Sequence, residues 1–181
     1  VPVESGLQGG LKSMRQRTIR SGGIVRRWHT TPPLHDQSVA EHSWGVSCII
    51  LELWPDCSKA LIMAALYHDV PESLIGDNPT PIKWKFPRLA EELDKVEQEV
   101  MKNLGVNITL KDYEKVMLKI ADMMELLWFC VEEERRGNRN FKEIFIRGTK
   151  FLQDLFATDH KVNITVPVKM LNELIAMEAD L

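Results

Sequence analysis

Apolar residues recur at helical spacing along almost the whole of this 181-residue chain. No convincing stretch shows the alternation of apolar and polar residues that a half-buried β-strand requires. A chain patterned in this way buries its apolar surface by packing helices against one another. Its length suits one domain with a sizeable core, and the sequence contains no internal repeat or domain linker. We therefore predict a single compact all-α bundle.

Capping residues, glycines and prolines mark the expected ends of the helices. A capping box at Ser38–Glu41 opens a helix that Pro55 stops after about Trp54. Thr109 is the expected N-cap of a long apolar helix that Gly137 ends. The other expected elements are helices at about 56–69, 87–104, 140–157 and 167–178, and a loop at 76–81.

Composition argues against several classes of protein. Hydrophobic residues at 44% and charged residues at 27% are ordinary for a soluble globular domain. A formal net charge of −3 gives no electrostatic reason to expect a nucleic-acid polymer as a partner. The longest apolar runs end well short of the roughly 18 residues that a membrane span needs. Three cysteines without C-x-x-C spacing indicate reduced thiols and a cytoplasmic protein.

The first 13 residues, VPVESGLQGGLKS, are typical of a linker or of a remnant added ahead of a start at Met14. They do not resemble a signal peptide, because no basic segment leads into an apolar one. We therefore expect the folded domain to cover residues 14–181.

His68 and Asp69 are adjacent, with His42 before them and Asp122 after them. Side chains of consecutive residues on a helix point about 100° apart, so both can bind one ion only if that ion lies between them. Two imidazoles and two carboxylates can supply four ligands to Zn, Co or Mn, among other divalent metals. A metal with room for a water molecule can activate that water as a nucleophile near neutral pH. The pattern therefore indicates hydrolysis.

Asp122 is unusual because its neighbours on the long predicted helix are almost all apolar. A buried carboxylate without a partner is strongly unfavourable, and a metal ion would compensate it. The alternative is a solvent-facing aspartate that lies beside Glu125 or pairs with Lys119. The three other candidate ligands favour the metal.

Five short motifs stand out along the chain. They are Arg27-Trp28, Ala40-Glu41-His42-Ser43, Tyr67-His68-Asp69-x-x-Glu72, Gly76-Asp77-x-Pro-Thr-Pro-x-Lys83 and Ala121-Asp122. Together they span about residues 15–140 and resemble the metal-dependent phosphohydrolases of the HD-domain superfamily, in particular the bacterial deoxyribonucleoside 5′-monophosphatases. The segment Arg20–Thr30 and the chain length are more similar to the small phage dATP triphosphohydrolases.

The resemblance implies a role for each matched polar residue. His42, His68, Asp69 and Asp122 would bind the catalytic metal. Glu72 would act as a general base or orient the water, unless it is only a solvated glutamate after a proline. Asp77 would accept a hydrogen bond from the deoxyribose 3′-hydroxyl or serve in acid–base chemistry, although a Gly-Asp-Asn sequence is also common in turns.

Substrate contacts are expected from the same motifs. Arg27 and Lys83 are candidates for binding phosphates, and Arg26 is a lesser one. Trp28 is either a wall of the base or sugar pocket or an ordinary core residue. Pro79 and Ile82 are expected to line the base site.

The resemblance implies hydrolysis of a deoxynucleotide, most specifically of dATP to deoxyadenosine and tripolyphosphate, as in a phage that depletes dATP. A 5′-monophosphatase that releases phosphate is the alternative, and a non-catalytic nucleotide-binding module is a remote one. An additional Mg ion with the triphosphate is also expected. The resemblance further implies a homo-oligomer, either a dimer or a hexamer, in the cytoplasm or, for a phage protein, in the host cytoplasm.

Overall fold

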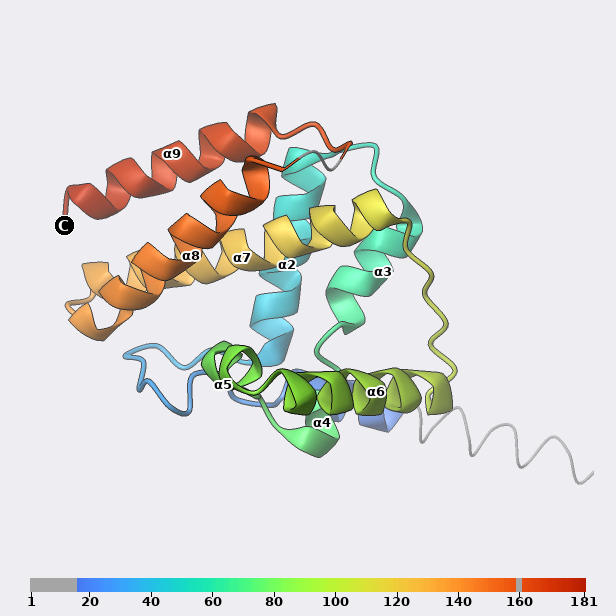
Figure 1. Ribbon diagram of the computed structural model, residues 1–181. Helices are drawn as coiled ribbons and strands as arrows, with labels where there is room; N and C mark the ends of the chain where they lie inside the picture. The colour runs from blue at the N-terminus through green and yellow to red at the C-terminus, as the bar shows by residue number, and fades with distance from the viewer. Residues whose placement is uncertain (1–15, 159–160) are drawn as a thin grey trace, which may run out of the picture.

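The long helix α7 (Asp112–Arg135) lies at the centre of the molecule, and other helices pack around it (Figure 1). The computed structural model describes residues 16–158 and 161–181, and within these ranges no β-strand is present. The prediction of an all-α bundle is therefore confirmed. The helices in contact with α7 are α2 (Val39–Leu53), α3 (Lys59–Tyr67), the short 3-10 helix η1 (Arg139–Phe141), α8 (Lys142–Phe156) and α9 (Thr165–Ala179).

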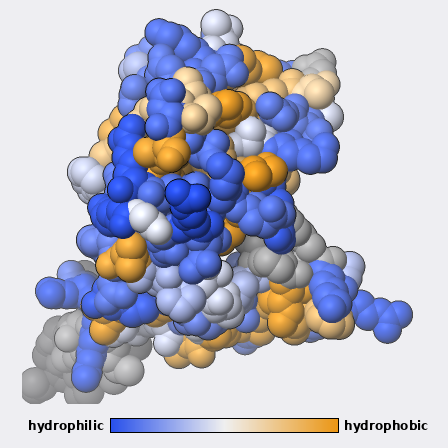
Figure 2. Space-filling model, turned by 90° about the vertical axis from the view of Figure 1, so that its left-hand side faces the viewer, coloured by the Kyte–Doolittle hydropathy of each residue, from blue (hydrophilic) through white to orange (hydrophobic). Residues whose placement is uncertain are grey.

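The core forms where α7 crosses its neighbours. Ile120, Met124 and Leu127 of α7 are fully buried, as are Ile50 of α2 and Leu61 of α3. Polar side chains cover most of the face shown in Figure 2, with apolar residues scattered among them. None of the described helices combines the length and the apolar character that crossing a bilayer requires.

A second group of helices lies on one side of this core (Figure 1). It consists of α4 (Glu72–Ile75), α5 (Thr80–Lys85) and α6 (Pro87–Asn103), with the helical residues 16–23 nearby. Helices α5 and α6 contact each other. The turn from α3 into α4 connects this group to the central helices, so residues 68–71 lie between the two parts.

The predicted helix boundaries hold at most positions, with two corrections. The loop expected at 76–81 ends early, because Thr80 already begins α5. A proline fits the first turn of a helix, where its missing N–H has no partner to lose, so Pro81 does not prevent this. The N-cap of α7 is Lys111 and not Thr109, because the Glu114 carboxylate accepts a hydrogen bond from the backbone N–H of Lys111. The segment predicted to be a linker, residues 1–13, lies outside the described residues.

The loop of residues 24–37 is anchored to the end of α7 by a buried carboxylate. Glu133 accepts hydrogen bonds from the backbone N–H groups of Leu34 and His35 and from the side-chain amide of Asn138. Burial alone would raise the pKa of Glu133, but these donors lower it below its ordinary value. The anchor therefore contributes its full stabilisation above the unfolded-state pKa, about 4.3, and loses it as the pH falls through the lowered folded-state pKa.

We expect Glu133→Ala to lower the free energy of unfolding by about 2–4 kcal/mol at pH 7, because it leaves three donors without their acceptor. Urea unfolding at several pH values measures this effect, which should shrink as the wild-type carboxylate becomes protonated. Glu132→Ala changes the exposed neighbour and serves as the control. Equal destabilisation by the two substitutions would show that the anchor is unimportant.

Candidate active site

Three of the four predicted metal ligands lie together at the ends of α2 and α3. His42 is in the first turn of α2 and is completely buried, and His68 and Asp69 directly follow the last residue of α3. One donor atom from each of these residues lies within 4.8 Å of the other two. The end of α3 therefore presents an adjacent imidazole and carboxylate to one point, as the dipeptide predicts.

The fourth predicted ligand, Asp122, reaches this group from the central helix α7. Its Oδ1 lies 3.2 Å from Nε2 of His42, and its Oδ2 accepts a hydrogen bond from Nζ of Lys119 at 3.0 Å. Both interpretations of Asp122 thus describe part of its surroundings, since it pairs with Lys119 and also faces the candidate metal ligands. Oδ2 of Asp69 lies 3.6 Å from the same His42 nitrogen.

Two buried imidazole nitrogens are available to bind a cation. Nε2 of His42 and Nε2 of His68 are buried, and neither makes a hydrogen bond with the described part of the chain. Nε2 of His68 lies 3.4 Å from Oδ1 of Asp69. Neutral imidazoles and carboxylates are donors that Zn, Co and Mn accept. The residues present therefore fit a divalent metal.

Nearby positive charges keep both aspartates ionised. Burial raises the pKa of Asp69, but the two histidines and Arg27 outweigh it, so the pKa is lowered. Burial also raises the pKa of Asp122. Lys119 and the two histidines outweigh this effect and hold that pKa well below its usual range. Burial and Arg27 lower the pKa of His42, but the surrounding carboxylates raise it to about 9. The two aspartates are thus negative at neutral pH, as ligands of a cation must be.

Glu72 lies next to this group, at the start of α4. Its Oε2 is buried and makes no hydrogen bond with the described residues. Burial and the negative charges of Asp69 and Asp77 raise the pKa of Glu72 to about 9. A carboxyl group of this kind can hold a proton at neutral pH, and a cation nearby would favour its release. The site thus contains a group suited to proton transfer.

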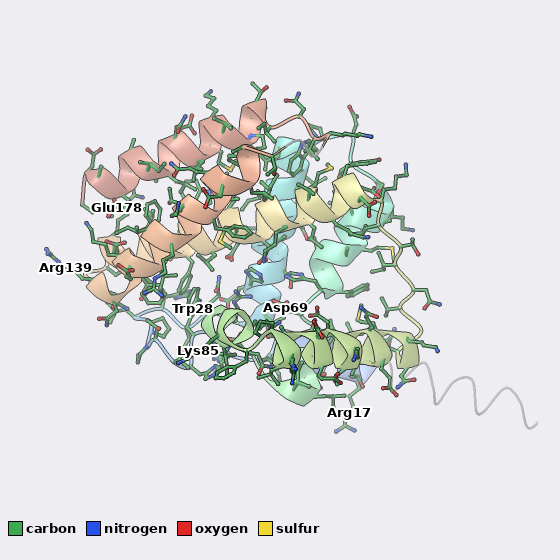
Figure 3. All side chains as sticks on the ribbon, in the orientation of Figure 1. Arg17, Trp28, Asp69, Lys85, Arg139 and Glu178 are labelled. Carbon is green, nitrogen blue, oxygen red and sulfur yellow. The ribbon has the colours of Figure 1, made fainter. Side chains whose placement is uncertain are left out.

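Arg27 and Trp28 connect the acidic group to the loop of residues 24–37. Arg27 donates a hydrogen bond from Nη1 to Oδ2 of Asp69 at 2.9 Å. Trp28 has a left-handed backbone with φ of 66°, and its N–H lies 3.3 Å from the Asp77 carboxylate, which accepts it. Its ring stacks on Phe129, with centroids 5.3 Å apart. In Figure 3, Trp28 and Asp69 lie between the central helices and the α5–α6 layer.

A cavity of about 330 Å³ opens beside Arg27 and Trp28. This volume is at the lower end of the range, about 300–1,000 Å³, that small-molecule sites occupy. Trp28 was expected to be either a pocket wall or a core residue. It is both, because it packs on the aromatic core and also lines the cavity. The predicted residues that line it are Arg27, Trp28, Asp77 and Pro79, and the other lining residues include Met123, Leu126, Asn140, Glu143, Ile144 and Arg147.

Three predicted substrate contacts do not line this cavity. Arg26 is exposed and lies 3.8 Å from Asp36, because adjacent residues of an extended segment point in opposite directions and Arg27 faces inward. Lys83 pairs with Glu97 of α6 at 3.3 Å, because α5 packs against that helix. Ile82 is 39% exposed on α5. The structure thus separates these three from the residues that surround the cavity.

Sequence reasoning did not assign a role to Glu125, which lies one helical turn after Asp122 and is mostly buried. Its carboxylate contacts Nδ1 of His42 and accepts a hydrogen bond from the side chain of Gln37. The only signal in the sequence was a charged residue within an apolar helix. Nothing in the sequence indicated that residues 140–147 line the cavity, because their position depends on how α8 packs against α7.

An all-α bundle with these side chains at the junction of α2, α3 and α7 defines the class of HD phosphohydrolases. Residues 17–169 match the family described as 5′-deoxynucleotidase YfbR-like. The chain therefore belongs to the YfbR-like 5′-deoxynucleotidase family, which confirms the family resemblance seen in its motifs.

Relatives in this family include proteins with two different names. A dATP triphosphohydrolase of Salmonella phage PMBT28 is 29% identical over 140 residues, which cover 67% of this chain and 69% of the relative. A 5′-deoxynucleotidase of Photorhabdus laumondii is 25% identical over 170 residues, which cover 80% of this chain and 86% of the relative. The chain is thus similar to both branches.

Solved structures with the same fold include two that cover most of the chain. The HD phosphohydrolase DatZ of cyanophage S-2L, bound to dA and one catalytic Zn²⁺ ion, has a TM-score of 0.67 and 18% sequence identity, with 91% of this chain and 96% of that chain covered. The protein PH0347 of Pyrococcus horikoshii has a TM-score of 0.61 and 18% sequence identity, with 91% of this chain and 98% of that chain covered. These likenesses support the fold.

Proposed function

We propose that this protein hydrolyses deoxynucleotides with a divalent metal, and that its specific reaction converts dATP to deoxyadenosine and tripolyphosphate. The observation that supports this most strongly is the group of His42, His68 and Asp69, whose donor atoms lie within 4.8 Å of one another. It lies beside a cavity of about 330 Å³, which falls within the range of small-molecule sites, and Arg27 contacts both.

His42, His68, Asp69 and Asp122 would hold the metal, with Zn, Co or Mn as candidates. When bound, the metal would supply charge stabilisation at the phosphoryl oxygens and lower the pKa of a water molecule. Those residues fix the position of the reacting phosphate through the rigid junction of α2, α3 and α7. An additional Mg ion that accompanies the triphosphate stays a prediction.

The other side chains would bind the substrate and move a proton. Arg27 would bind a phosphate oxygen with the part of its guanidinium that Asp69 does not occupy. Glu72 would exchange a proton with the attacking water or the leaving oxygen, since its Oε2 is buried without a partner. Asp77 and Trp28 would bind the sugar and the base in the cavity that both residues line.

Hydrolysis of a deoxynucleoside 5′-monophosphate to release phosphate is the second candidate. The bacterial 5′-deoxynucleotidase relative aligns with a larger share of this chain, 80%, than the phage dATP triphosphohydrolase does, 67%. The same metal ligands, Arg27 and Glu72 serve either reaction. The two differ in the number of phosphates that must be bound beyond the first.

Product analysis separates these candidates. The purified, zinc-loaded protein is incubated with dATP, other deoxynucleoside triphosphates, ATP and dAMP, and the products are resolved by ion-exchange chromatography. We expect deoxyadenosine and tripolyphosphate from dATP, with dAMP unchanged. Phosphate release from dAMP with inert triphosphates would establish the monophosphatase. No turnover of any substrate would favour a nucleotide-binding module.

We expect Trp28→Ala to weaken the binding of deoxyadenosine by roughly 5- to 150-fold, because stacking of a base on an aromatic ring contributes about 1–3 kcal/mol. Isothermal titration calorimetry with the zinc-loaded protein measures the affinity. Trp44→Ala is the matched control, since Trp44 is 68% exposed on α2 and does not line this cavity. Unchanged affinity in the Trp28 variant would remove this residue from the base site.

The family resemblance also implies a homo-oligomer, a dimer or a hexamer, and action in the cytoplasm, or in the host cytoplasm for a phage protein. Both remain proposals. Sedimentation velocity of the purified protein tests the first of them.

A further inference from the structure

A chain of side-chain hydrogen bonds runs from the cavity to the candidate metal site. Nε1 of Trp28 donates to Oε1 of Gln37 at 2.8 Å, and Nε2 of Gln37 donates to Oε1 of Glu125 at 2.7 Å. The other carboxylate oxygen of Glu125 contacts Nδ1 of His42. Gln37 and Glu125 therefore join two residues, Trp28 and His42, that belong to different parts of the site.

The chemistry of the indole group fixes the direction of this chain. An indole N–H only donates, so the oxygen of the Gln37 amide must face Trp28 and its NH₂ group must face Glu125. Glu125 then accepts at Oε1 as a carboxylate, and its Oε2 is free to accept from Nδ1–H of His42. With the proton held at Nδ1, the lone pair of a neutral His42 lies at Nε2, which faces Asp69 and Asp122.

Burial makes these contacts difficult to replace. Gln37 is 4% exposed, Glu125 is 8% exposed and His42 is completely buried, so solvent reaches them poorly. Gly45, one turn after His42 on α2, leaves the space for Glu125, because a Cβ atom at Gly45 would lie 2.9 Å from Cγ of Glu125. A broken hydrogen bond in this chain therefore leaves a buried polar group unsatisfied.

We infer that Gln37 and Glu125 are positioning residues that couple the wall of the nucleoside cavity to the metal-binding imidazole. Glu125 holds His42 in the tautomer that offers Nε2 to a metal. Gln37 keeps Glu125 oriented, and the indole N–H of Trp28 keeps Gln37 oriented. This inference rests on the proposed metal site at His42.

Zinc affinity of the full chain is the first test, measured by competition with a chromophoric chelator. We expect Glu125→Gln to weaken zinc binding by about 10- to 100-fold, the usual effect of losing the partner of a metal-bound histidine. Gln37→Leu is expected to weaken it by roughly three- to tenfold, because the buried carboxylate loses one donor. Glu132→Gln, an exposed change on the same helix, is the matched control and should leave zinc affinity unchanged.

Long-range ¹H–¹⁵N NMR of the zinc-loaded protein reports the tautomer directly. In the wild type, Nδ1 of His42 should carry the proton and Nε2 should not. Gln37→Leu should shift the Nδ1 resonance, even though Gln37 is linked to His42 only through Glu125 in this hydrogen-bond chain. An unchanged resonance in this variant would contradict the inference, whether or not Glu125→Gln folds.

A double-mutant cycle between Trp28 and Glu125 tests the coupling. In Glu125→Gln, the new amide must turn its oxygen to His42, so its NH₂ group faces the NH₂ group of Gln37. Gln37 can turn over to relieve this conflict only by facing its NH₂ group toward the indole N–H. Trp28→Phe removes that N–H, so the double variant should bind zinc more tightly than the product of the two single effects predicts.

The outcomes separate this inference from the proposed function. If the two substitutions changed zinc affinity independently, so that the double variant showed the product of the single effects, the coupling would be overturned. The proposed metal site would not be affected by that result. Wild-type zinc affinity in both Glu125→Gln and Gln37→Leu would overturn the positioning role. A wild-type protein that binds no zinc would overturn the proposed metal site and this inference with it.

Discussion

Asp122→Asn is expected to abolish tight zinc binding and to lower kcat/KM by about 10²- to 10³-fold, the order of loss seen when one electrostatic stabiliser is removed. The substitution removes the negative oxygen that lies 3.2 Å from Nε2 of His42. An amide of the same shape keeps the packing of α7 but offers the cation no charge. Zinc content of the purified variant and the rate of dATP hydrolysis measure the two effects.

The chain provides a matched control for this variant on the same helix. Asp112 pairs with Lys115 three residues later at 2.9 Å, whereas Asp122 pairs with Lys119 three residues earlier at 3.0 Å. The Asp112 side chain is 99% exposed and lies at the first residue of α7. Asp112→Asn should therefore leave zinc content and rate unchanged. Full zinc content in Asp122→Asn would show that Asp122 is not a ligand.

Glu72→Gln should lower kcat by about 10²- to 10⁴-fold while zinc content stays at the wild-type level, because an amide cannot transfer the proton that a general acid or base moves. The buried Oε2 of Glu72 and its pKa of about 9 support this role. Single-turnover kinetics with dATP measure the chemical step, and metal analysis of the same sample measures zinc.

Glu92→Gln is the control for Glu72. Glu92 is exposed on α6, where it pairs with Lys95 at 2.6 Å, and it does not line the nucleoside cavity. Its replacement should therefore have little effect on kcat. Loss of zinc from the Glu72 variant would identify Glu72 as a ligand, and an unchanged kcat would exclude it from proton transfer.

Helix positions were largely predictable because they depend on local chemistry. The Ser38 capping box and Pro55 bound α2 within one residue of the expected limits, since both act on the backbone of their own turn. The same reasoning failed for α7, where the cap depends on Glu114, whose carboxylate also accepts a hydrogen bond from Ser58 of another segment.

The candidate site was only partly predictable. The candidate ligands His42, His68 and Asp69 were proposed from their residue types and order, and the bundle brings their donor atoms within 4.8 Å of one another. Lys83 matches its motif but pairs with Glu97, because the motif does not specify how α5 packs against α6.

The sequence alone determined the all-α class, most helix limits and the residue types suited to a divalent metal, because periodicity, caps and donor chemistry are properties of short segments. The tertiary structure alone decided which side chains meet. Gln37 and Glu125 are 88 positions apart, and their hydrogen bond exists only because the loop of residues 24–37 lies against α7. Contacts of this kind depend on the packing of whole helices, which no local pattern encodes.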